Sequence, residues 1–321
     1  MTRLLNLVFA GTPRFAVPTL EALADAGHHV SLVVTQPDKP RGRGMEVTAS
    51  PVKQSALARG FEIAQPERIK NNPEFQSQLK AINPDAIIVV GYGRIIPQWM
   101  IDLPPYGNLN VHASLLPRYR GAAPIQWAIA EGETVTGVTI MRIDSGLDTG
   151  DILTQRELPI SPNDTAETLA PTLAGLGAAL LIETLAELAR DKIRAVPQDH
   201  ARASLAPILQ KEDGRIDFHR NATQIRNRLR GFQPWPGAFT AFRGKNLHIW
   251  SAQVIPVDSV PASLRPAEIV SLDGFLIVGC GQKTALEINE VQLEGKKRMS
   301  GRDFANGYRP FQGEFLGAAA S

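Results

Sequence analysis

Residues 108–121 have the sequence Asn-Leu-Asn-Val-His-Ala-Ser-Leu-Leu-Pro-Arg-Tyr-Arg-Gly, which predicts a strand followed by a polar loop. Alternate side chains of a strand point to the same face, so Asn110 and His112 should share one face. Pro117, in the loop, should keep the strand from continuing past Ala113. Two polar side chains are therefore expected at the carboxyl end of a strand, where open α/β sheets place their ligand sites.

The N-terminal segment predicts the beginning of a doubly wound α/β domain. Leu4–Ala10 and Val30–Val34 are apolar runs typical of buried strands, and Phe15–Ala26 between them has helical periodicity. Ala86–Val90 is a further apolar strand. The first turn, Gly11-Thr12-Pro13, has neither the three-glycine fingerprint nor a Walker lysine, so nicotinamide dinucleotide and ATP are not indicated.

Length and composition indicate an ordinary globular protein of two domains. The chain has 321 residues, of which 43% are hydrophobic and 21% charged. Its single cysteine, Cys280, lies in an apolar run, which favours a buried structural thiol over a nucleophile and excludes an internal disulfide. We find no stretch that approaches a membrane span and no secretory cleavage pattern, so a cytoplasmic protein is expected.

The C-terminal third predicts a small basic β-barrel. Residues 1–200 carry 18 Lys and Arg against 21 Asp and Glu, a net charge of −3, whereas residues 201–321 carry 16 against 11, a net charge of +5. This asymmetry suggests a polyanionic partner, although so small an excess is more often just an ordinary solvated surface. Short strands with glycine turns are expected at Leu247–Ala252, Glu268–Val270, Gly274–Val278 and Ala285–Val291.

A basic loop interrupts the first domain between Gln36 and Val52. It is rich in glycine and proline and has little capacity for regular structure. Loops of this length inside compact domains are usually functional or disordered. The cations in and beside it, Lys39, Arg41 and Arg43 with Lys53, suit an arm that becomes ordered on phosphates, but a mobile solvated loop is equally compatible.

Two further loops are candidates for a ligand site. Gly91–Pro97 directly follows a predicted strand, and its glycines would let a flat ligand approach the backbone with Ile95 and Ile96 as walls. An ordinary turn with core contacts is the alternative. Asp144–Asp151 holds three aspartates and two glycines, but its spacing does not fit a calcium loop. A carboxylate in this loop is better suited to orienting an imidazole than to binding calcium.

Asn110, His112 and an aspartate suit acyl transfer to an amine. An amide N–H can stabilise the oxyanion that forms when an amine attacks a carbonyl, and a histidine can move the proton at neutral pH. No nucleophile-elbow pattern surrounds Ser114, so covalent catalysis is not indicated. From the residues alone, Asn110 and His112 could also be satisfied polar groups at a strand end.

Several motifs together resemble the folate-dependent formyltransferases. The strand segment Asn110–Pro117, followed by Arg120-Gly121 and by Gly146–Asp151, is similar to the signature of that family. Within the family, the chain resembles the branch that formylates methionyl-tRNA. The motifs that carry this second resemblance are Ala10–Pro13, Gln36–Pro40 with Gly42-Arg43-Gly44, Ser50–Lys53, Arg120–Ile125 and Pro234-Trp235-Pro236, and they cover nearly the whole chain in the right order.

The resemblance implies a Rossmann-like doubly wound catalytic domain at residues 1–190, a linker at 191–207 and an OB-like β-barrel at 208–316. It places the catalytic roles on Asn110, His112 and Asp148. The folate site that it implies comprises Val90, Gly91, Tyr92, Gly93, Ile95, Ser114, Leu115, Leu116, Pro117, Asp144 and Asp148. Together with the basic segments, it predicts tRNA contacts from Lys39, Arg41, Arg43, Lys53, Arg226, Arg228, Lys296, Lys297 and Arg298, with Arg43 as the key arginine of the inserted loop.

The activity implied is formyl transfer from 10-formyltetrahydrofolate to the α-amino group of initiator methionyl-tRNA, without a metal and without a covalent intermediate. We expect a cytoplasmic monomer. Alternatives are formyl transfer to a nucleotide-sugar amine, hydrolysis of 10-formyltetrahydrofolate, and a nucleic-acid-binding protein that has lost catalysis.

Overall fold

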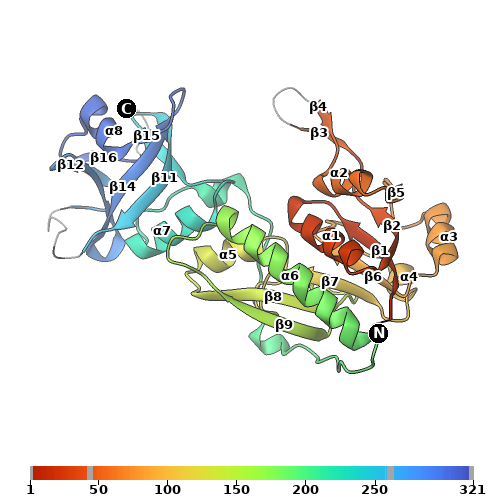
Figure 1. The fold of residues 1–321 in the computed structure, drawn as a ribbon. Coiled ribbons are helices and arrows are strands. Elements are labelled where there is room, and N and C mark those ends of the chain that lie inside the picture. The colour runs from red at the N-terminus through yellow and green to blue at the C-terminus, as the bar shows by residue number, and fades with distance from the viewer. Residues whose placement is uncertain (1–2, 42–45, 257, 259–263, 318–321) are drawn as a thin grey trace. The chain divides into compact units, whose positions relative to one another are not determined.

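The computed structural model describes residues 3–41, 46–256, 258 and 264–317, with only the backbone described at residues 39–41 and 46–47. The chain divides into two compact units (Figure 1). The first contains residues 1–124, 135–159 and 170–207, and the second contains residues 125–134, 160–169 and 208–321. The segment predicted as a linker, residues 191–207, groups with the first unit.

The first unit is built on one seven-stranded sheet, and the predicted Rossmann-like class is confirmed. Five strands are parallel, β8 pairs antiparallel with the fifth of them, β7, and β9 pairs antiparallel with β8. The parallel strands are buried because apolar runs such as Ala86–Val90 can face helices on both sides. In spatial order the strands are β5 (Ile63–Ala64), β2 (His29–Val34), β1 (Asn6–Gly11), β6 (Ala86–Val90), β7 (Asn108–His112), β8 (Val135–Arg142) and β9 (Ile152–Pro159).

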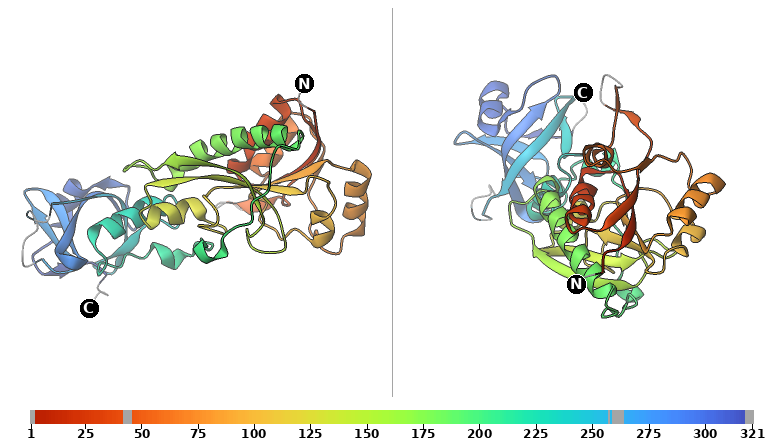
Figure 2. Two further views of the ribbon diagram at one scale, coloured as in Figure 1. Left: turned by 90° about the horizontal axis from the view of Figure 1, so that it is seen from below. Right: turned by 45° about the vertical axis from the view of Figure 1, so that its right-hand side comes forward.

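Helices cover both faces of this sheet, as Figure 2 shows. One face packs against α3 and α4, where Val8, Ile87, Phe75 and Met100 belong to a single buried cluster. Ser50 caps the helix that begins at Pro51, because its hydroxyl accepts a hydrogen bond from the amide of Lys53 at 3.1 Å. The helices connected to the sheet are α1 (Val17–Asp25), α2 (Pro51–Ala58), α3 (Pro73–Ile82), α4 (Gln98–Ile101) and α6 (Ala166–Leu188).

By length and composition alone, α6 is apolar enough to cross a membrane. The expectation that the chain has no such stretch is therefore wrong. The helix nevertheless lies against the sheet: a Cβ added at Gly177 would be 2.6 Å from a methyl carbon of Val111 in β7. Core helices of soluble proteins pass the same test of composition, and the packing of α6 on the sheet explains its apolar surface.

The basic loop contains more regular structure than its composition predicts. β3 (Lys39–Arg41) and β4 (Glu46–Thr48) pair antiparallel, so the loop leaves the sheet as a short hairpin. Lys39 pairs with Thr48 and Arg41 with Glu46. The expectation of an irregular loop is wrong for these residues, because antiparallel backbone pairing can form despite the glycine and proline content.

The second unit is an antiparallel barrel, as predicted. Its strands follow the order β10 (Phe239–Phe242), β11 (Lys245–Val254), β14 (Thr284–Leu293), β13 (Phe275–Cys280), β12 (Glu268–Leu272) and β16 (Glu314–Phe315), and β15 (Met299–Ser300) pairs with β14. The amide of Gly317, just after β16, donates a 2.7 Å hydrogen bond to the carbonyl of Ala241 in β10. The two ends of the sheet therefore meet and nearly close it.

Helices α5 (Pro124–Ala130), α7 (Ala222–Gly231) and α8 (Gly301–Tyr308) complete the second unit. Phe304 of α8 lies edge to face with Phe242 of β10 at 5.0 Å between ring centroids. Cys280 is buried in the barrel core, and burial raises the pKa of its thiol to about 12. The thiol stays protonated at neutral pH, in agreement with the structural role predicted for it.

Candidate active site

The site is built on β7 and the turn that follows it. β7 ends at His112, where the sequence predicted, and it lies between parallel β6 and antiparallel β8. Thr139 of β8 holds the following turn: its hydroxyl donates to the carbonyl of Ser114 at 2.6 Å and accepts from the amide of Leu116 at 3.1 Å. Gln155 of β9 adds a 2.8 Å hydrogen bond to the carbonyl of Leu116. The two antiparallel strands thus fix the turn that follows β7.

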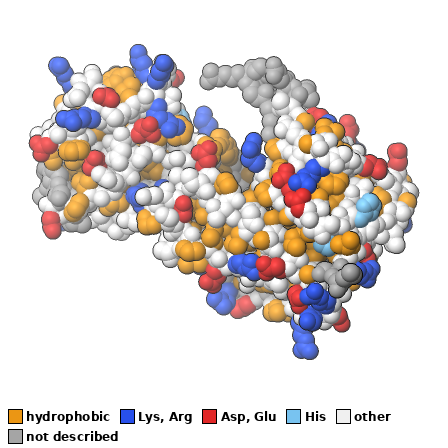
Figure 3. Space-filling view, viewed as in Figure 1, with side chains coloured by type: hydrophobic (Ala, Val, Ile, Leu, Met, Phe, Trp, Pro, Cys, Tyr) orange, Lys and Arg blue, Asp and Glu red, His pale blue; other side chains and the backbone are white. Residues whose placement is uncertain are grey.

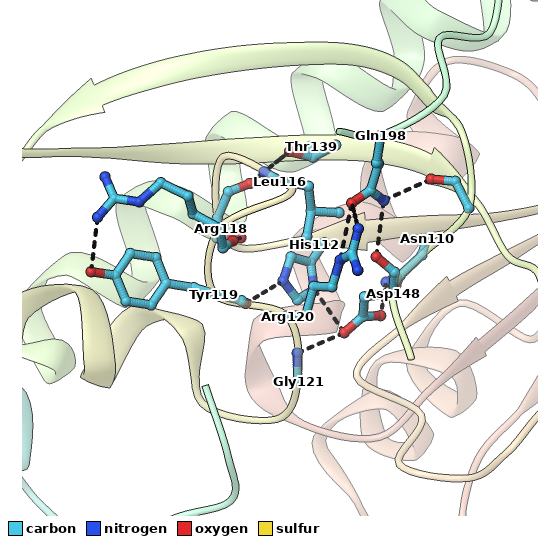
Figure 4. Close-up of polar contacts among 12 residues, drawn as sticks. Asn110, His112, Leu116, Arg118, Tyr119, Arg120, Gly121, Thr139, Asp148 and Gln198 are labelled. Atoms are coloured by element: carbon cyan, nitrogen blue, oxygen red, sulfur yellow. Dashed lines mark hydrogen bonds and ion pairs between the residues drawn. The ribbon is translucent and has the colours of Figure 1, made fainter. Parts of the chain in front are cut away.

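The imidazole of His112 is buried and held in one tautomer. Its Nε2 lies 3.0 Å from the carbonyl of Tyr119, and a carbonyl can only accept, so Nε2 must carry the hydrogen. The second nitrogen, Nδ1, then faces the carboxylate of Asp148, with 3.7 Å between Nδ1 and Oδ2 (Figure 4). His112 therefore presents Nδ1 to the site, and the backbone of Tyr119, which the sequence did not indicate, orients the ring.

Asp148, the predicted aspartate, lies beside Asn110 and His112 of β7. Its Oδ2 accepts a 2.8 Å hydrogen bond from the amide of Gly121, and its Oδ1 lies 3.5 Å from the side-chain nitrogen of Asn110. The contact with Asn110 points the amide nitrogen, rather than the oxygen, toward the carboxylate. Figure 4 shows the side chains of Asn110, His112 and Asp148 converging at the end of β7. An amide donor, an imidazole nitrogen and a carboxylate therefore meet at one point.

The glycine loop after β6 adopts a conformation that suits glycine. Gly91 and Gly93 have φ of +55° and +74°, in the region that residues with a Cβ rarely adopt. Tyr92 between them is buried in the core, and burial raises the pKa of its phenol to about 12. Gln36 holds the loop by donating a 2.8 Å hydrogen bond to the carbonyl of Tyr92. Of the two residues predicted as walls, Ile95 is 90% exposed, whereas Ile96 is buried in the core cluster that contains Tyr92, so the expectation for Ile96 is wrong.

The other residues predicted to bind folate lie around this loop or the turn. Val90, Ser114 and Leu116 are buried and Leu115 is half-buried. Asp144 organises its own loop, because its carboxylate accepts hydrogen bonds from the amide of Gly146 at 3.0 Å and from the hydroxyl of Thr149 at 2.7 Å. Asp144 is thus engaged within the loop that carries Asp148.

The residues predicted to bind tRNA divide by location. Arg43 lies outside the described residues, and the side chains of Lys39 and Arg41 are not described. Lys53, at the foot of the hairpin, is paired internally: its ammonium lies 2.5 Å from a carboxylate oxygen of Asp38 and 2.7 Å from Oε1 of Gln65. Hydrogen bonds from Lys53 and Gln65 hold the pKa of Asp38 below its usual value.

The basic residues of the second unit differ in how they are engaged. Arg228 packs over the ring of Phe232 at 4.7 Å, and burial lowers the pKa of its guanidinium. Arg226 donates to the carbonyl of Pro162 at 2.9 Å. Lys296, Lys297 and Arg298 are exposed. Figure 3 shows several Lys and Arg side chains standing out from the surface of the second unit.

Among the described residues, no group of three or more His, Cys, Asp or Glu side chains is arranged to hold a metal ion.

Comparison with known proteins places the chain in a family. The description "Formyl transferase" matches residues 3–185, and "Formyl transferase, C-terminal domain" matches residues 208–309. The chain is 66% identical to the methionyl-tRNA formyltransferase of Koribacter versatilis, over 98% of this chain and 99% of that protein. It is 61% identical to the methionyl-tRNA formyltransferase of Acidobacterium capsulatum, over 94% and 96% respectively.

Solved structures agree in fold. An N-formyltransferase from Helicobacter canadensis, crystallised with folinic acid and dTDP-3-aminofucose, has a TM-score of 0.66 at 19% identity and is covered over 99% of its length and 89% of this chain. HypX from Aquifex aeolicus, in complex with tetrahydrofolic acid, has a TM-score of 0.60 at 18% identity, over 95% of this chain and 48% of that chain. The chain belongs to the formyltransferase family and, within it, to the methionyl-tRNA formyltransferases.

Proposed function

We propose that this protein transfers the formyl group of 10-formyltetrahydrofolate to the α-amino group of methionyl-initiator tRNA, giving N-formylmethionyl-tRNA for translation initiation. The observation that carries the chemistry is the meeting of Asn110, His112 and Asp148 at the end of β7. The acceptor is supported by the methionyl-tRNA formyltransferases to which the chain is similar over nearly its whole length.

In this mechanism, Asn110 and His112 stabilise the tetrahedral intermediate. When the uncharged amine attacks the formyl carbon, the carbonyl oxygen becomes negative, and the amide hydrogens of Asn110 and a protonated Nδ1 of His112 donate to it. Donors fixed in advance are effective because they need not reorganise during the reaction. The hydrogen bond from Nε2 to Tyr119 leaves Nδ1 as the nitrogen available for this role.

Asp148 balances the charge and completes the proton transfer. The attacking nitrogen loses a proton, and the departing N10 of tetrahydrofolate gains one. A carboxylate 3.7 Å from Nδ1 attracts the positive charge of a protonated His112. Its Oδ1, close to the amide of Asn110, keeps that donor turned toward the site. The formyl group passes directly from donor to acceptor, and no serine or cysteine nucleophile takes part.

We place the folate between the glycine loop, with Val90–Gly93 and Ile95, the Ser114–Pro117 turn and the Asp144–Asp148 loop. The exposed side chains of Ile95 and Leu147, at 90% and 61%, are apolar surface suited to a flat ring system. Folate compounds bound to two proteins of this fold support the same class of ligand here. The formyl-bearing form, 10-formyltetrahydrofolate, follows from the direction of the reaction.

We place the tRNA on the hairpin β3–β4 and on the barrel. The hairpin leaves the sheet at the foot where Asp38 and Lys53 are paired, so it is anchored at both ends. Arg43, which lies between the two hairpin strands in the sequence, would contact the acceptor arm together with Lys39 and Arg41. The exposed cations of the barrel, Lys296–Arg298, would contact phosphates. In this arrangement residues 1–190 carry the chemistry and residues 208–316 extend the RNA surface.

The direct test is formylation of methionyl-initiator tRNA compared with methionyl-elongator tRNA at several salt concentrations. We expect strong preference for the initiator. Because each phosphate contact releases counterions, kcat/KM should fall with salt, with a slope of about −0.7 to −0.9 per contact on a double-logarithmic plot. Formyl transfer to neither tRNA, with folate still bound, would contradict the proposed acceptor and direct attention to small amines.

Replacing Arg43 by alanine should weaken recognition of the tRNA and leave folate binding unchanged. Loss of a good arginine contact costs about 1–3 kcal/mol, so KM for initiator tRNA should rise roughly 5- to 150-fold. Folate titration followed by fluorescence, beside tRNA kinetics, measures both. Arg59→Ala is the matched control, since Arg59, at the C-cap of α2, pairs with Asp25 of α1 at 2.7 Å, outside the hairpin. Equal effects of the two substitutions would remove Arg43 from recognition.

We also propose that the protein acts as a cytoplasmic monomer. The packing of α6 on the sheet and the burial of Cys280 account for its apolar helix and its one thiol without a membrane or a disulfide partner. Light scattering at micromolar concentration should give the mass of one chain. A mass of two chains would contradict this expectation.

A further inference from the structure

The side chain of Gln198 is buried and uses its full hydrogen-bonding capacity within the active-site region. Its amide nitrogen donates to the carbonyl of Asp148 at 2.9 Å and to that of Gly150 at 2.7 Å. Its Oε1 accepts from Arg120 twice, at 3.1 Å from Nε and 2.7 Å from Nη2 (Figure 4). An amide has two donors and two acceptor sites, and all four are occupied. A side chain that donates two hydrogen bonds and accepts two in this way must be an amide.

The two carbonyls that Gln198 binds belong to a turn that needs support. Asp148 has a φ of +51°, a conformation that is uncommon for residues other than glycine and persists where the surroundings enforce it. Gly150 lies so close to Arg142 that an added Cβ would be 2.0 Å from its carbonyl oxygen. The turn therefore packs closely against the end of β8 on one side. On the other, Gln198 binds the carbonyls of Asp148 and Gly150.

Arg120 depends on the same amide. It is 7% exposed, and among the residues that the structure describes no carboxylate lies within ion-pair distance of it. Its side-chain partners are Oε1 of Gln198 and Nδ1 of His200 at 3.1 Å. Arg120 directly precedes Gly121, whose amide donates to the carboxylate of Asp148. Gln198 thus joins the segment that carries Asp148 to the segment that binds its carboxylate.

The chain around Gln198 is itself fixed on the first unit. Val196 exchanges two hydrogen bonds with Ile152, at 2.9 and 2.8 Å, directly after the Asp148 turn. Farther along, the carbonyl of Ser204 accepts from the amide of Arg120 at 2.8 Å, and the amide of Ala206 donates to the carbonyl of Arg120 at 2.7 Å. The segment predicted as a linker is therefore paired with both halves of the site.

We propose that Gln198 is a positioning residue for formyl transfer: it holds the carboxylate of Asp148 against Nδ1 of His112 and the amide of Asn110. This inference rests on the proposed function, because it assigns Gln198 a role in that reaction. Residues 191–207, predicted as a linker, then belong to the active-site region through Gln198 and do more than connect two domains.

Two substitutions of Gln198 test its hydrogen bonds to Arg120 and to the carbonyls of Asp148 and Gly150. Gln198→Glu keeps acceptors for Arg120 but turns a carboxylate oxygen toward the carbonyls of Asp148 and Gly150. Gln198→Asn keeps both kinds of group on a side chain one methylene shorter, which cannot reach both partners. A misplacement of about 1 Å can cost ~100-fold in rate, so kcat should fall roughly 10- to 100-fold for both variants. KM for the tRNA should change by less than about threefold, since the RNA contacts are untouched.

A double-mutant cycle distinguishes positioning from general destabilisation. If Gln198 acts through Asp148, Gln198→Asn should reduce the single-turnover rate constant of the otherwise wild-type protein. The same substitution should have little further effect when combined with Asp148→Asn. Additive losses would overturn the proposal. Asp199→Ala is the matched control: Asp199 is the exposed neighbour that caps a short turn through Ala201, and its loss should leave kcat unchanged.

A second readout does not depend on activity. The amide of Gly121 is bonded to Oδ2 of Asp148, so its hydrogen exchange, followed by NMR at a temperature where each variant is folded, reports the position of the carboxylate. We expect exchange at Gly121 to be at least ~10-fold faster in both Gln198 variants and unchanged in Asp199→Ala. Unchanged protection would overturn the proposal. A wild-type protein that fails to formylate methionyl-tRNA would instead refute the proposed function, while the exchange measurement would still test the positioning.

Discussion

Asn110→Ala should reduce kcat for formyl transfer by roughly 100- to 1,000-fold, the usual cost of removing one oxyanion donor. The reason is geometric. The amide nitrogen of Asn110 lies 3.5 Å from Oδ1 of Asp148, which turns the donor toward the point that Nδ1 of His112 also faces. Alanine removes the donor and leaves the charge that forms on the formyl oxygen to His112 alone. Single-turnover formylation at saturating folate and tRNA measures the loss.

A second asparagine supplies the control for this experiment. Asn72 caps α3 by accepting a 3.1 Å hydrogen bond from the amide of Phe75, outside the site. Asn72→Ala should cost about 1 kcal/mol of stability and leave kcat unchanged. If Asn110→Ala instead retained a kcat within about threefold of wild type, Asn110 could not be the principal oxyanion donor.

The sequence predicted the catalytic strand well, because its signal is local. Alternation along β7 puts Asn110 and His112 on one face, and both approach Asp148 in the structure. The apolar runs of β1, β2 and β6 likewise indicate strands buried on both faces. Periodicity of this kind depends only on neighbours in the chain.

Other parts of the fold had weaker local signals. β9 was not predicted: along Ile152–Pro159 charged and polar residues are interspersed among the apolar ones, as suits a half-exposed edge strand. The β3–β4 hairpin was not predicted either, because the glycines and prolines in this segment indicate an irregular loop. In both cases the strand forms through backbone pairing with a neighbouring strand, and side-chain composition predicts such pairing only weakly.

The partners that orient the site lay beyond a sequence-based prediction for a different reason. The carbonyl of Tyr119 and the amide of Gly121 are backbone groups, which every residue possesses, so no residue type marks them. Gln198 is a side-chain partner, but it is 50 residues from Asp148 in the chain. Only the path of the chain after α6 brings them together.

His112→Ala should lower kcat at least ~100-fold, since it removes both the second oxyanion donor and the proton carrier. It should also lower stability, because the 3.0 Å hydrogen bond between Nε2 and the carbonyl of Tyr119 is lost, and a hydrogen bond within a protein contributes about 0.5–1.5 kcal/mol. Thermal unfolding monitored by circular dichroism, beside single-turnover kinetics, measures the two effects on the same samples.

Two further substitutions at His112 separate catalysis from stability. The amide nitrogen of glutamine can take the place of Nε2 and donate to Tyr119, whereas that of asparagine lies near the position of Nδ1 and faces Asp148. If Nδ1 is the catalytic nitrogen, His112→Gln should be the more stable variant and His112→Asn the more active one, although neither carries the positive charge of an imidazolium. The reverse order of activity would mean that Nε2 serves the reaction, and that its hydrogen bond to Tyr119 is broken when the substrates bind.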